Sequence, residues 1–423
     1  MRLLMKKIRQ IMNRLFSDEL LRHASILFAG MMVVHVCNMV FQMTVSRALP
    51  KEEYALLAAF LAVMAIIQRP VTTLTTGVSH YASLLQQDGR RGDVACLLRK
   101  WLLLCGGTGL LLGGLAVVFN APVAGFLHLE RSAPVVIGGL ILPALFSLPV
   151  LGGAGQGLQL FGWCSASTIL GALVRLGLGA GFVWFVVPAC GWAMMGHGLG
   201  MYASAGLLLL GLFLVLHGSV KSTEKLPSMR FYLLQSFFIQ AAYAVLMTAD
   251  VVLVKHYIPA DDEFAYAATL GRMVVFLPGA IVAAMFPKVA SRGVGSEEQR
   301  RVFIKSLSLT GFFVAASVFG CFLFSGLLAH ILFGMHNASA YLKKMIGLMA
   351  LVMGFNALLY VLLQYFLAQR RFKPALAVVF LSVIYLIAVR MTHGSSWVIA
   401  GISGICNFIS FVCLFVCLER KNG

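Results

Sequence analysis

The sequence predicts an all-α integral membrane protein with about twelve transmembrane helices, arranged as two pseudo-symmetric lobes of six helices each. Hydrophobic residues make up 60% of the 423 residues and charged residues only 11%. The mean hydropathy is +0.91, well above that of soluble globular domains. Apolar segments of about 20 residues, long enough to cross a bilayer, recur along the whole chain, and similar motifs return at matching places in its two halves.

Each predicted span is an apolar run bounded by polar, charged or helix-breaking residues. Because the number of spans in each half is even, both halves enter the membrane from the same side. The spans fall near residues 23–48, 54–80, 101–120, 133–160, 163–187, 192–217, 231–257, 264–287, 303–333, 341–368, 374–391 and 395–418.

The segments outside the spans complete the predicted organisation. Residues 1–22 are basic and amphipathic and lack a signal-peptide cleavage pattern, so they are expected to form a cytoplasmic interfacial helix. The N-terminal lobe covers residues 23–217 and the C-terminal lobe residues 231–418. A basic cytoplasmic linker, 218–230, joins the lobes, and 419–423 form a cytoplasmic tail.

The distribution of charge predicts the orientation. Lys and Arg outnumber Asp and Glu by 33 to 15, for a net charge of +18. Under the twelve-span topology most loop Lys and Arg residues lie on the side of the N-terminus, which the positive-inside rule makes cytoplasmic. The basic excess is therefore a topology signal, and nucleic acid is excluded as a partner. The nine cysteines are scattered, mostly within apolar runs, so neither a disulfide framework nor a metal site is expected.

A repeated motif supports the two-lobe arrangement. The loop after the first span runs from Pro50 through acidic residues to an aromatic, Tyr54, and the loop after the seventh repeats this order from Pro259 to Phe264. Similar spacing places Pro70 of the second span opposite Pro278 of the eighth. Parallel repeats of this kind are typical of transporters whose substrate path lies between the halves. Both prolines are expected to kink helices beside a cavity.

Four charged residues fall within spans, where a charge is costly unless it faces a bundle interior or a water-filled path. Arg69, Arg175 and Arg272 are expected to form a series of cations at different depths, and Asp250 lies level with Arg272 and is able to pair with it. Three cations with one counter-charge leave an excess of positive charge, which favours an anionic cargo. A guanidinium group binds phosphate or carboxylate through two hydrogen bonds. We therefore expect the three arginines to bind substrate and Asp250 to couple transport to H⁺ or Na⁺; no other cofactor is expected.

Structural alternatives exist for these residues. Arg69 is able to reach the membrane interface along its own stem, and Arg272 with Asp250 is also interpretable as a structural ion pair. Two pairs of glycines, Gly109 with Gly113 and Gly177 with Gly181, have the spacing that permits close helix packing.

The motifs resemble a known family. SRALPKEEY (46–54) after the first span and QGLQLFGW (156–163) between the fourth and fifth, with QYFLAQRRFK (364–373) as a second-half counterpart, are similar to motifs of Wzx-like polysaccharide-biosynthesis flippases. These belong to the multidrug/oligosaccharidyl-lipid/polysaccharide (MOP) exporter superfamily, which also contains the MATE antiporters. The resemblance covers nearly the whole chain through its span count and half-repeat.

This resemblance implies a V-shaped pair of lobes that moves an undecaprenyl-pyrophosphate-linked oligosaccharide across the bacterial inner membrane, for assembly of lipopolysaccharide O-antigen or exopolysaccharide. It also implies membrane lipids as partners and, as protein partners, a polysaccharide polymerase or glycosyltransferases. Lipid II flippases typically have two further spans, which this chain lacks. A MATE-like cation-coupled antiporter of drugs or metabolites is the alternative, followed by a membrane glycan polymerase or glycosyltransferase. A scaffold without transport activity has little support.

Overall fold

The computed structural model describes residues 19–126, 132–218, 230–276, 278–279, 281–282, 285, 289, 297–369 and 371–419. Helices make up most of this part of the chain, and it contains no strand. Eleven helical segments in it are long and apolar enough to cross a bilayer. The remaining predicted span, 264–287, begins with helix α12 and runs into positions that are described only in part. The predicted fold class is thus confirmed.

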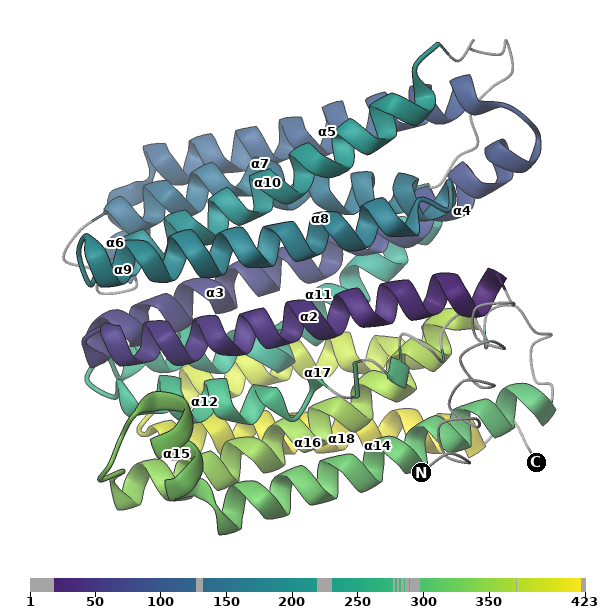
Figure 1. Cartoon of the computed structure of the whole chain (residues 1–423). Coiled ribbons are helices and arrows are strands. Elements are labelled where there is room, and N and C mark those ends of the chain that lie inside the picture. Colours follow the sequence, from purple (N-terminus) through teal and green to yellow (C-terminus); the bar gives the residue numbers. More distant parts are fainter. Residues whose placement is uncertain are drawn as a thin grey trace, which may run out of the picture.

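The first half of the chain forms one bundle of helices (Figure 1). Its elements are α2 (Glu19–Ala48), α3 (Lys51–Val71), α4 (Thr73–Gln87), α5 (Arg91–Val118), α6 (Asn120–Phe126), α7 (Ala133–Gly157), α8 (Phe161–Val174), the π-helix η1 (Arg175–Ala180), α9 (Gly181–Phe185) and α10 (Cys190–Leu216). Within this bundle α7 packs against α4, α5 and α10, and α8 packs against α2 and α10. We call it the N-lobe.

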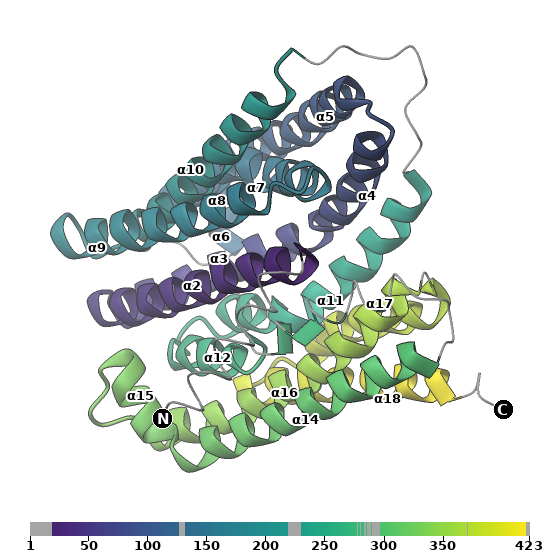
Figure 2. The same ribbon diagram turned by 45° about the vertical axis from the view of Figure 1, so that its right-hand side comes forward.

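The second half forms the C-lobe, which lies beside the first in both views (Figures 1 and 2). It comprises α11 (Arg230–Tyr257), α12 (Glu263–Met273), α14 (Glu297–Leu323), α15 (Ser325–Phe333), α16 (Ala340–Ala368), α17 (Phe372–Met391) and α18 (Ser396–Glu419). The lobes meet mainly where α3 packs along α11. The predicted segment 1–22 lies almost wholly outside the described residues, as do the linker 218–230 and the tail 419–423 apart from their end positions.

The two lobes together have two ends, which we name after residues that lie there. At the Pro50 end, α2 turns into α3 and α11 turns into α12. At the opposite Gln87 end, α4, α7 and α16 terminate and α11 begins. In the predicted topology the Pro50 end is external and the Gln87 end cytoplasmic.

The second span is divided in two at Thr72, where α3 ends and α4 begins. Pro70 occupies the last turn of α3 and supplies no backbone N–H, so the carbonyl one turn before it loses a helical donor. Neighbouring threonines stabilise the break: Thr72 Oγ1 donates to the Arg69 carbonyl at 2.6 Å, and Thr73 Oγ1 to the Pro70 carbonyl at 2.7 Å. Pro70 therefore lies directly before a helix break.

The two predicted glycine pairs behave differently. A Cβ added at Gly113 would lie 2.4 Å from the carbonyl oxygen of Gly139 on α7, and one at Gly109 would lie 2.7 Å from Cα of Pro143. This pair therefore permits the close approach of α5 and α7, as predicted. A Cβ at Gly177 or at Gly181 would have no neighbour within 4 Å. The close-packing prediction for that second pair is wrong, because it lies in and after the π-helix on a face without a tightly packed partner.

Candidate functional site

A cavity of about 820 Å³ lies between the two lobes, in the half of the bundle nearest the Gln87 end. Its lining comes from both halves of the chain: α2, α3 and α4 with one residue of α7 on one side, and α11, α16 and the residues after α12 on the other. Gln156, in the last turn of α7, contributes to the lining at the Gln87 end. The site therefore has the position expected for a substrate path between lobes.

Most of the described residues that line the cavity are polar, and none of them is acidic. Among these residues Arg69 is the one permanent cation. The other polar groups are two histidines, hydroxyls and amides: His35, Thr72, Thr73, Thr76, Ser79, His80, Gln156, Ser236, Gln240, Tyr360 and Gln364. The Ser236 hydroxyl and the Gln240 side-chain oxygen are buried without a hydrogen-bond partner in the described structure. An unpaired buried polar atom is costly, so these two groups would be stabilised by a polar partner that reached them.

Arg69 reaches from the N-lobe into an aromatic pocket of the C-lobe. Its guanidinium carbon lies 5.4 Å from the ring centroid of Tyr243 and 5.3 Å from that of Tyr360. One of its terminal nitrogens lies 3.5 Å from the sulfur of Met247. No carboxylate of the described residues pairs with it. Its charge is stabilised by ring faces, a weak interaction of about 0.5–2 kcal/mol, so it stays available to an anion.

A buried network in the C-lobe holds the rings that receive Arg69. Tyr243 and Tyr360 are stacked, with centroids 5.2 Å apart. The Tyr243 hydroxyl donates to Asn356 Oδ1 at 2.7 Å, and Asn356 Nδ2 donates to Asn407 Oδ1 at 2.8 Å. Because Tyr243, Asn356 and Asn407 are fully buried, their hydrogen bonds fix the ring orientation.

The sequence analysis missed these aromatic residues, although the sequence contains a signal for them. Ser236, Gln240, Tyr243 and Met247 follow one another at helical spacing on α11, and Asn356, Tyr360 and Gln364 do so on α16. Two polar stripes with a helical period, each inside an apolar span, indicate faces turned toward a cavity or a polar network. A search for single charges does not detect them.

Arg175 lies elsewhere, inside the N-lobe. It opens the π-helix η1, donates from Nη1 to Asn38 Oδ1 on α2 at 3.1 Å, and places its guanidinium carbon 4.2 Å from the Phe41 ring centroid. Its Nε is buried without a partner. Arg175 is not among the residues that line the cavity.

Arg272 and Asp250 form a buried ion pair within the C-lobe. Arg272 Nη2 donates to Asp250 Oδ1 at 2.6 Å, and the two side chains are 16% and 1% exposed. Arg272 also points toward the carbonyls of Met247 and Thr248, at 3.4 Å each. The structure thus shows the pairing that the depths of the two residues predicted. Arg272 does not line the cavity, but Met247 lies between the two sites, because its sulfur faces Arg69 and its carbonyl faces Arg272.

Oδ2 of Asp250 is buried without a hydrogen-bond partner among the described residues, and so is the hydroxyl of Tyr385 on α17. Sequence analysis did not identify Tyr385, which stands alone in an apolar helix. The second predicted kink residue, Pro278, is buried five positions after the end of α12, where its neighbours are described only in part.

At the Pro50 end the lobes are in direct contact. Lys51 of α3 pairs with Glu263 of α12 at 3.1 Å, and Nδ1 of His256 on α11 lies 2.7 Å from the carbonyl oxygen of Phe126 on α6. The rings of Phe126 and His256 are stacked 4.0 Å apart. These contacts join the two lobes at the Pro50 end, next to a separate pocket of about 880 Å³ lined by residues such as Glu52, Glu53 and Lys255.

The chain has the fold of solved MOP superfamily transporters. A multidrug resistance MATE family transporter in its inward-facing conformation matches 94% of this chain and 98% of its own length, with a TM-score of 0.66 and 14% sequence identity. The outward-facing conformation of such a transporter matches 95% of this chain and 94% of its own, also with a TM-score of 0.66 and 14% identity. A MOP transporter from Pyrococcus furiosus matches 95% of this chain and 94% of its own length, with a TM-score of 0.63 and 13% identity. That protein is described as having a binding pocket of reverse polarity, which suggests a different function. No protein-family model and no curated protein matches the sequence.

Proposed function

We propose that this protein is a flippase that moves a lipid-pyrophosphate-linked oligosaccharide from the cytoplasmic to the outer face of the bacterial inner membrane by alternating access. The observation that supports this most directly is the polarity of the cavity between the lobes. It combines a guanidinium group with many hydroxyls and amides, and its described lining contains no carboxylate. Hydroxyl and amide groups match a glycan, and an unpaired guanidinium matches a phosphate.

The cavity offers the head group a substitute for its hydration. A pyrophosphate-linked glycan cannot enter hydrocarbon, because an unpaired ion in a medium of low dielectric constant is prohibitively costly. Polar groups on both lobes replace water during passage, and no covalent bond is made or broken. In the predicted topology the cavity faces the cytoplasm, where such a substrate is assembled.

Arg69 is proposed to link substrate binding to movement of the lobes. In this structure it belongs to the N-lobe and lies against two rings of the C-lobe. A pyrophosphate forms charge-assisted hydrogen bonds that are stronger than these ring contacts. Substrate therefore draws Arg69 away from the C-lobe and removes an interlobe contact, which biases the equilibrium between the two conformations. Arg175 and Arg272, assigned the same role from sequence, reach substrate only after the helices around them rearrange.

Asp250 is proposed to couple transport to H⁺ or Na⁺. Neutralisation of this carboxylate by an ion or a proton would leave Arg272 without its partner, and a buried unpaired cation is strongly unfavourable. The ion thereby favours a conformation in which Arg272 is hydrated or meets an anion. The same pair, set in a fold shared with MATE transporters, also supports a second candidate, a cation-coupled antiporter of drugs or metabolites.

The test is translocation of a fluorescent lipid-linked oligosaccharide in proteoliposomes, read by quenching from outside. Arg69→Ala is expected to slow translocation at least about tenfold, the effect of losing one charge-assisted contact. The translocation rate of Arg69→Lys is expected to lie between those of the wild type and Arg69→Ala. Arg175→Ala and Arg272→Ala test the other two assigned positions. Arg301→Ala is the matched control, because it removes one exposed positive charge that pairs with Glu297 and does not line the cavity.

The two candidates give different results. Wild-type translocation by Arg69→Ala would contradict the proposed site. If the three arginines can be neutralised together without effect, while Asp250→Asn abolishes gradient-driven transport of an organic cation, the protein is an antiporter. Joining of sugar units by the purified protein would instead establish an enzyme.

A further inference from the structure

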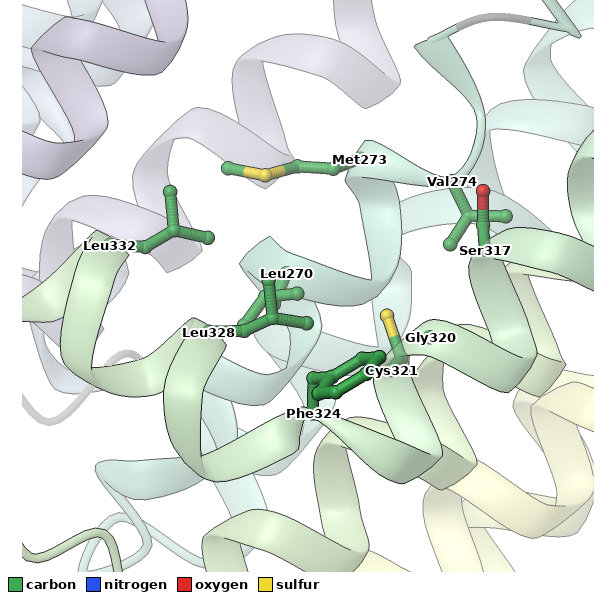
Figure 3. Close-up of a pocket in the computed structure, with 9 residues that line it drawn as sticks. All are labelled: Leu270, Met273, Val274, Ser317, Gly320, Cys321, Phe324, Leu328 and Leu332. Atoms are coloured by element: carbon green, nitrogen blue, oxygen red, sulfur yellow. The ribbon is translucent and has the colours of Figure 1, made fainter.

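The C-lobe contains a second pocket, apolar and of about 300 Å³, between α12, α14 and α15. Figure 3 shows side chains of the three elements around it. Leu270 and Met273 come from α12, Cys321 from α14, and Leu328 and Leu332 from α15. Ser317 supplies the one polar side chain among the described residues of its lining. Such a pocket suits a hydrocarbon chain and offers almost nothing to a polar ligand.

This pocket and the polar cavity share one wall. Met273 and Val274 line the apolar pocket, and the next residues of the chain, Val275 and Phe276, line the polar cavity. The segment that ends α12 is therefore a single layer of backbone with an apolar compartment on one side and a polar compartment on the other. The wall extends to the N-lobe, because the Phe276 ring stacks on His35 of α2 at 5.1 Å.

We propose that the pocket between α12, α14 and α15 binds the polyprenyl chain of the substrate while the pyrophosphate and glycan occupy the cavity beside Arg69. This inference rests on the proposed function, since it needs a cargo with a polar head and a long apolar chain. The two compartments have the polarities of the two parts of that cargo. Because the two compartments share a wall, the junction between the diphosphate and the prenyl chain would lie at the C-terminal end of α12.

The chain itself provides a matched control. Another apolar pocket of about 280 Å³ lies between α16 and α18, lined by residues such as Phe355 and Phe408. Its lining shares no residue with the cavity and contains no residue adjacent in sequence to one that lines the cavity. Each pocket has a glycine in its lining, Gly320 in the first and Gly401 in the second. A Cβ on either would meet no atom within 4 Å, so Gly320→Leu and Gly401→Leu fill the two pockets without a backbone clash.

The experiment uses the full chain in nanodiscs and two photoreactive lipids. One is an oligosaccharyl polyprenyl diphosphate with a diazirine in its prenyl chain, and the other is phosphatidylglycerol with a diazirine at a similar distance from its head group. We expect the prenyl probe to label α12, α14 and α15 peptides, and Gly320→Leu to reduce this labelling and weaken binding about tenfold, the effect of leaving about two CH₂ groups unburied. Gly401→Leu should change neither. A methyl diphosphate of the same oligosaccharide, which has no prenyl chain, should bind wild type and Gly320→Leu equally.

Several outcomes would overturn the inference. Equal labelling of these peptides by phosphatidylglycerol would make the pocket a site for any bilayer lipid. Labelling of other helices, or wild-type binding by Gly320→Leu, would place the chain elsewhere while the flippase proposal stands, provided that the wild type translocates the substrate. If the wild type neither binds the methyl diphosphate nor moves the lipid-linked glycan, both proposals fail. Labelling of the wild type decides the question even if Gly320→Leu does not fold.

Discussion

Tyr54 of the N-lobe and Tyr266 of the C-lobe stack on each other across the lobe junction, with ring centroids 4.3 Å apart. Both are 1% exposed, and the Tyr54 hydroxyl lies 3.1 Å from Oγ1 of Thr269. Both tyrosines lie in the first turns of their helices at the Pro50 end, Tyr54 in α3 and Tyr266 in α12. The pair therefore joins the lobes at this end with residues contributed by both repeats of the chain.

Removing one of these rings should shift the conformational equilibrium. Tyr54→Ala is expected to favour the state open at the Pro50 end by up to about tenfold, since an aromatic pair contributes about 0.5–1.5 kcal/mol beyond its buried area. Spin labels on genetically encoded residues at Gln87 and Lys373 would report this as a shorter distance across the Gln87 end. Tyr54→Phe keeps the ring and should shift the distance distribution less. An unchanged distribution in Tyr54→Ala would show that the stack does not hold the lobes together.

The ion pair between Lys51 and Glu263 offers a charge-exchange test at the same end. Each single reversal, Lys51→Glu or Glu263→Lys, should weaken closure, and the double exchange should restore it, because only the double variant pairs opposite charges. The lysine side chain is 55% exposed, so an effect below about 1 kcal/mol that fades at high salt is expected. The same spin-label distances measure it. If the double exchange does not restore the wild-type distances, the pair has no role in closure.

The Asp250–Arg272 pair should be more costly to break than to replace. Asp250→Asn is expected to lower the free energy of unfolding by about 3–5 kcal/mol, because it leaves a buried guanidinium without a counter-charge. Asp250→Asn combined with Arg272→Met should recover most of that loss. Unfolding of the purified protein in detergent, followed by circular dichroism, measures both. Equal stability of the wild type and Asp250→Asn would indicate a carboxyl group that is already neutral.

Neighbouring glycines of α5 give a packing test. Gly113→Ala should destabilise the N-lobe by about 1–3 kcal/mol, since its methyl group would lie 2.4 Å from the Gly139 carbonyl oxygen and force α5 and α7 apart. Gly114→Ala, one position along, has open space around its Cβ and should be neutral or stabilising by up to about 1 kcal/mol. Thermal unfolding in detergent distinguishes them. Similar stabilities of the two variants would contradict close packing at Gly113.

Features of this molecule that depend only on position along the chain were predictable from its sequence. Apolar run length predicts the spans, and depth along a span predicts that Asp250 and Arg272 meet. The surroundings of Arg69 and Arg175 were not predictable, because depth does not specify which way a side chain points around its helix. Arg69 faces the cavity, whereas Arg175 turns toward α2 and Asn38. That difference depends on the rotation of each helix about its axis, which the sequence does not determine for a span that is apolar on nearly every face.

The π-helix Arg175–Ala180 gives the fifth span one turn that is able to lose a residue. A wide turn of this kind contains one residue more than the α-helical turn it replaces. Deletion of a single residue there would let an ordinary α-helix form, and without the surplus residue the helix beyond would keep its present facing. A deletion of one residue within the α-helical part of α8 would instead rotate everything that follows by about 100°. The wide turn is thus expected to tolerate the loss of one residue, whereas the α-helical turns on either side of it are not.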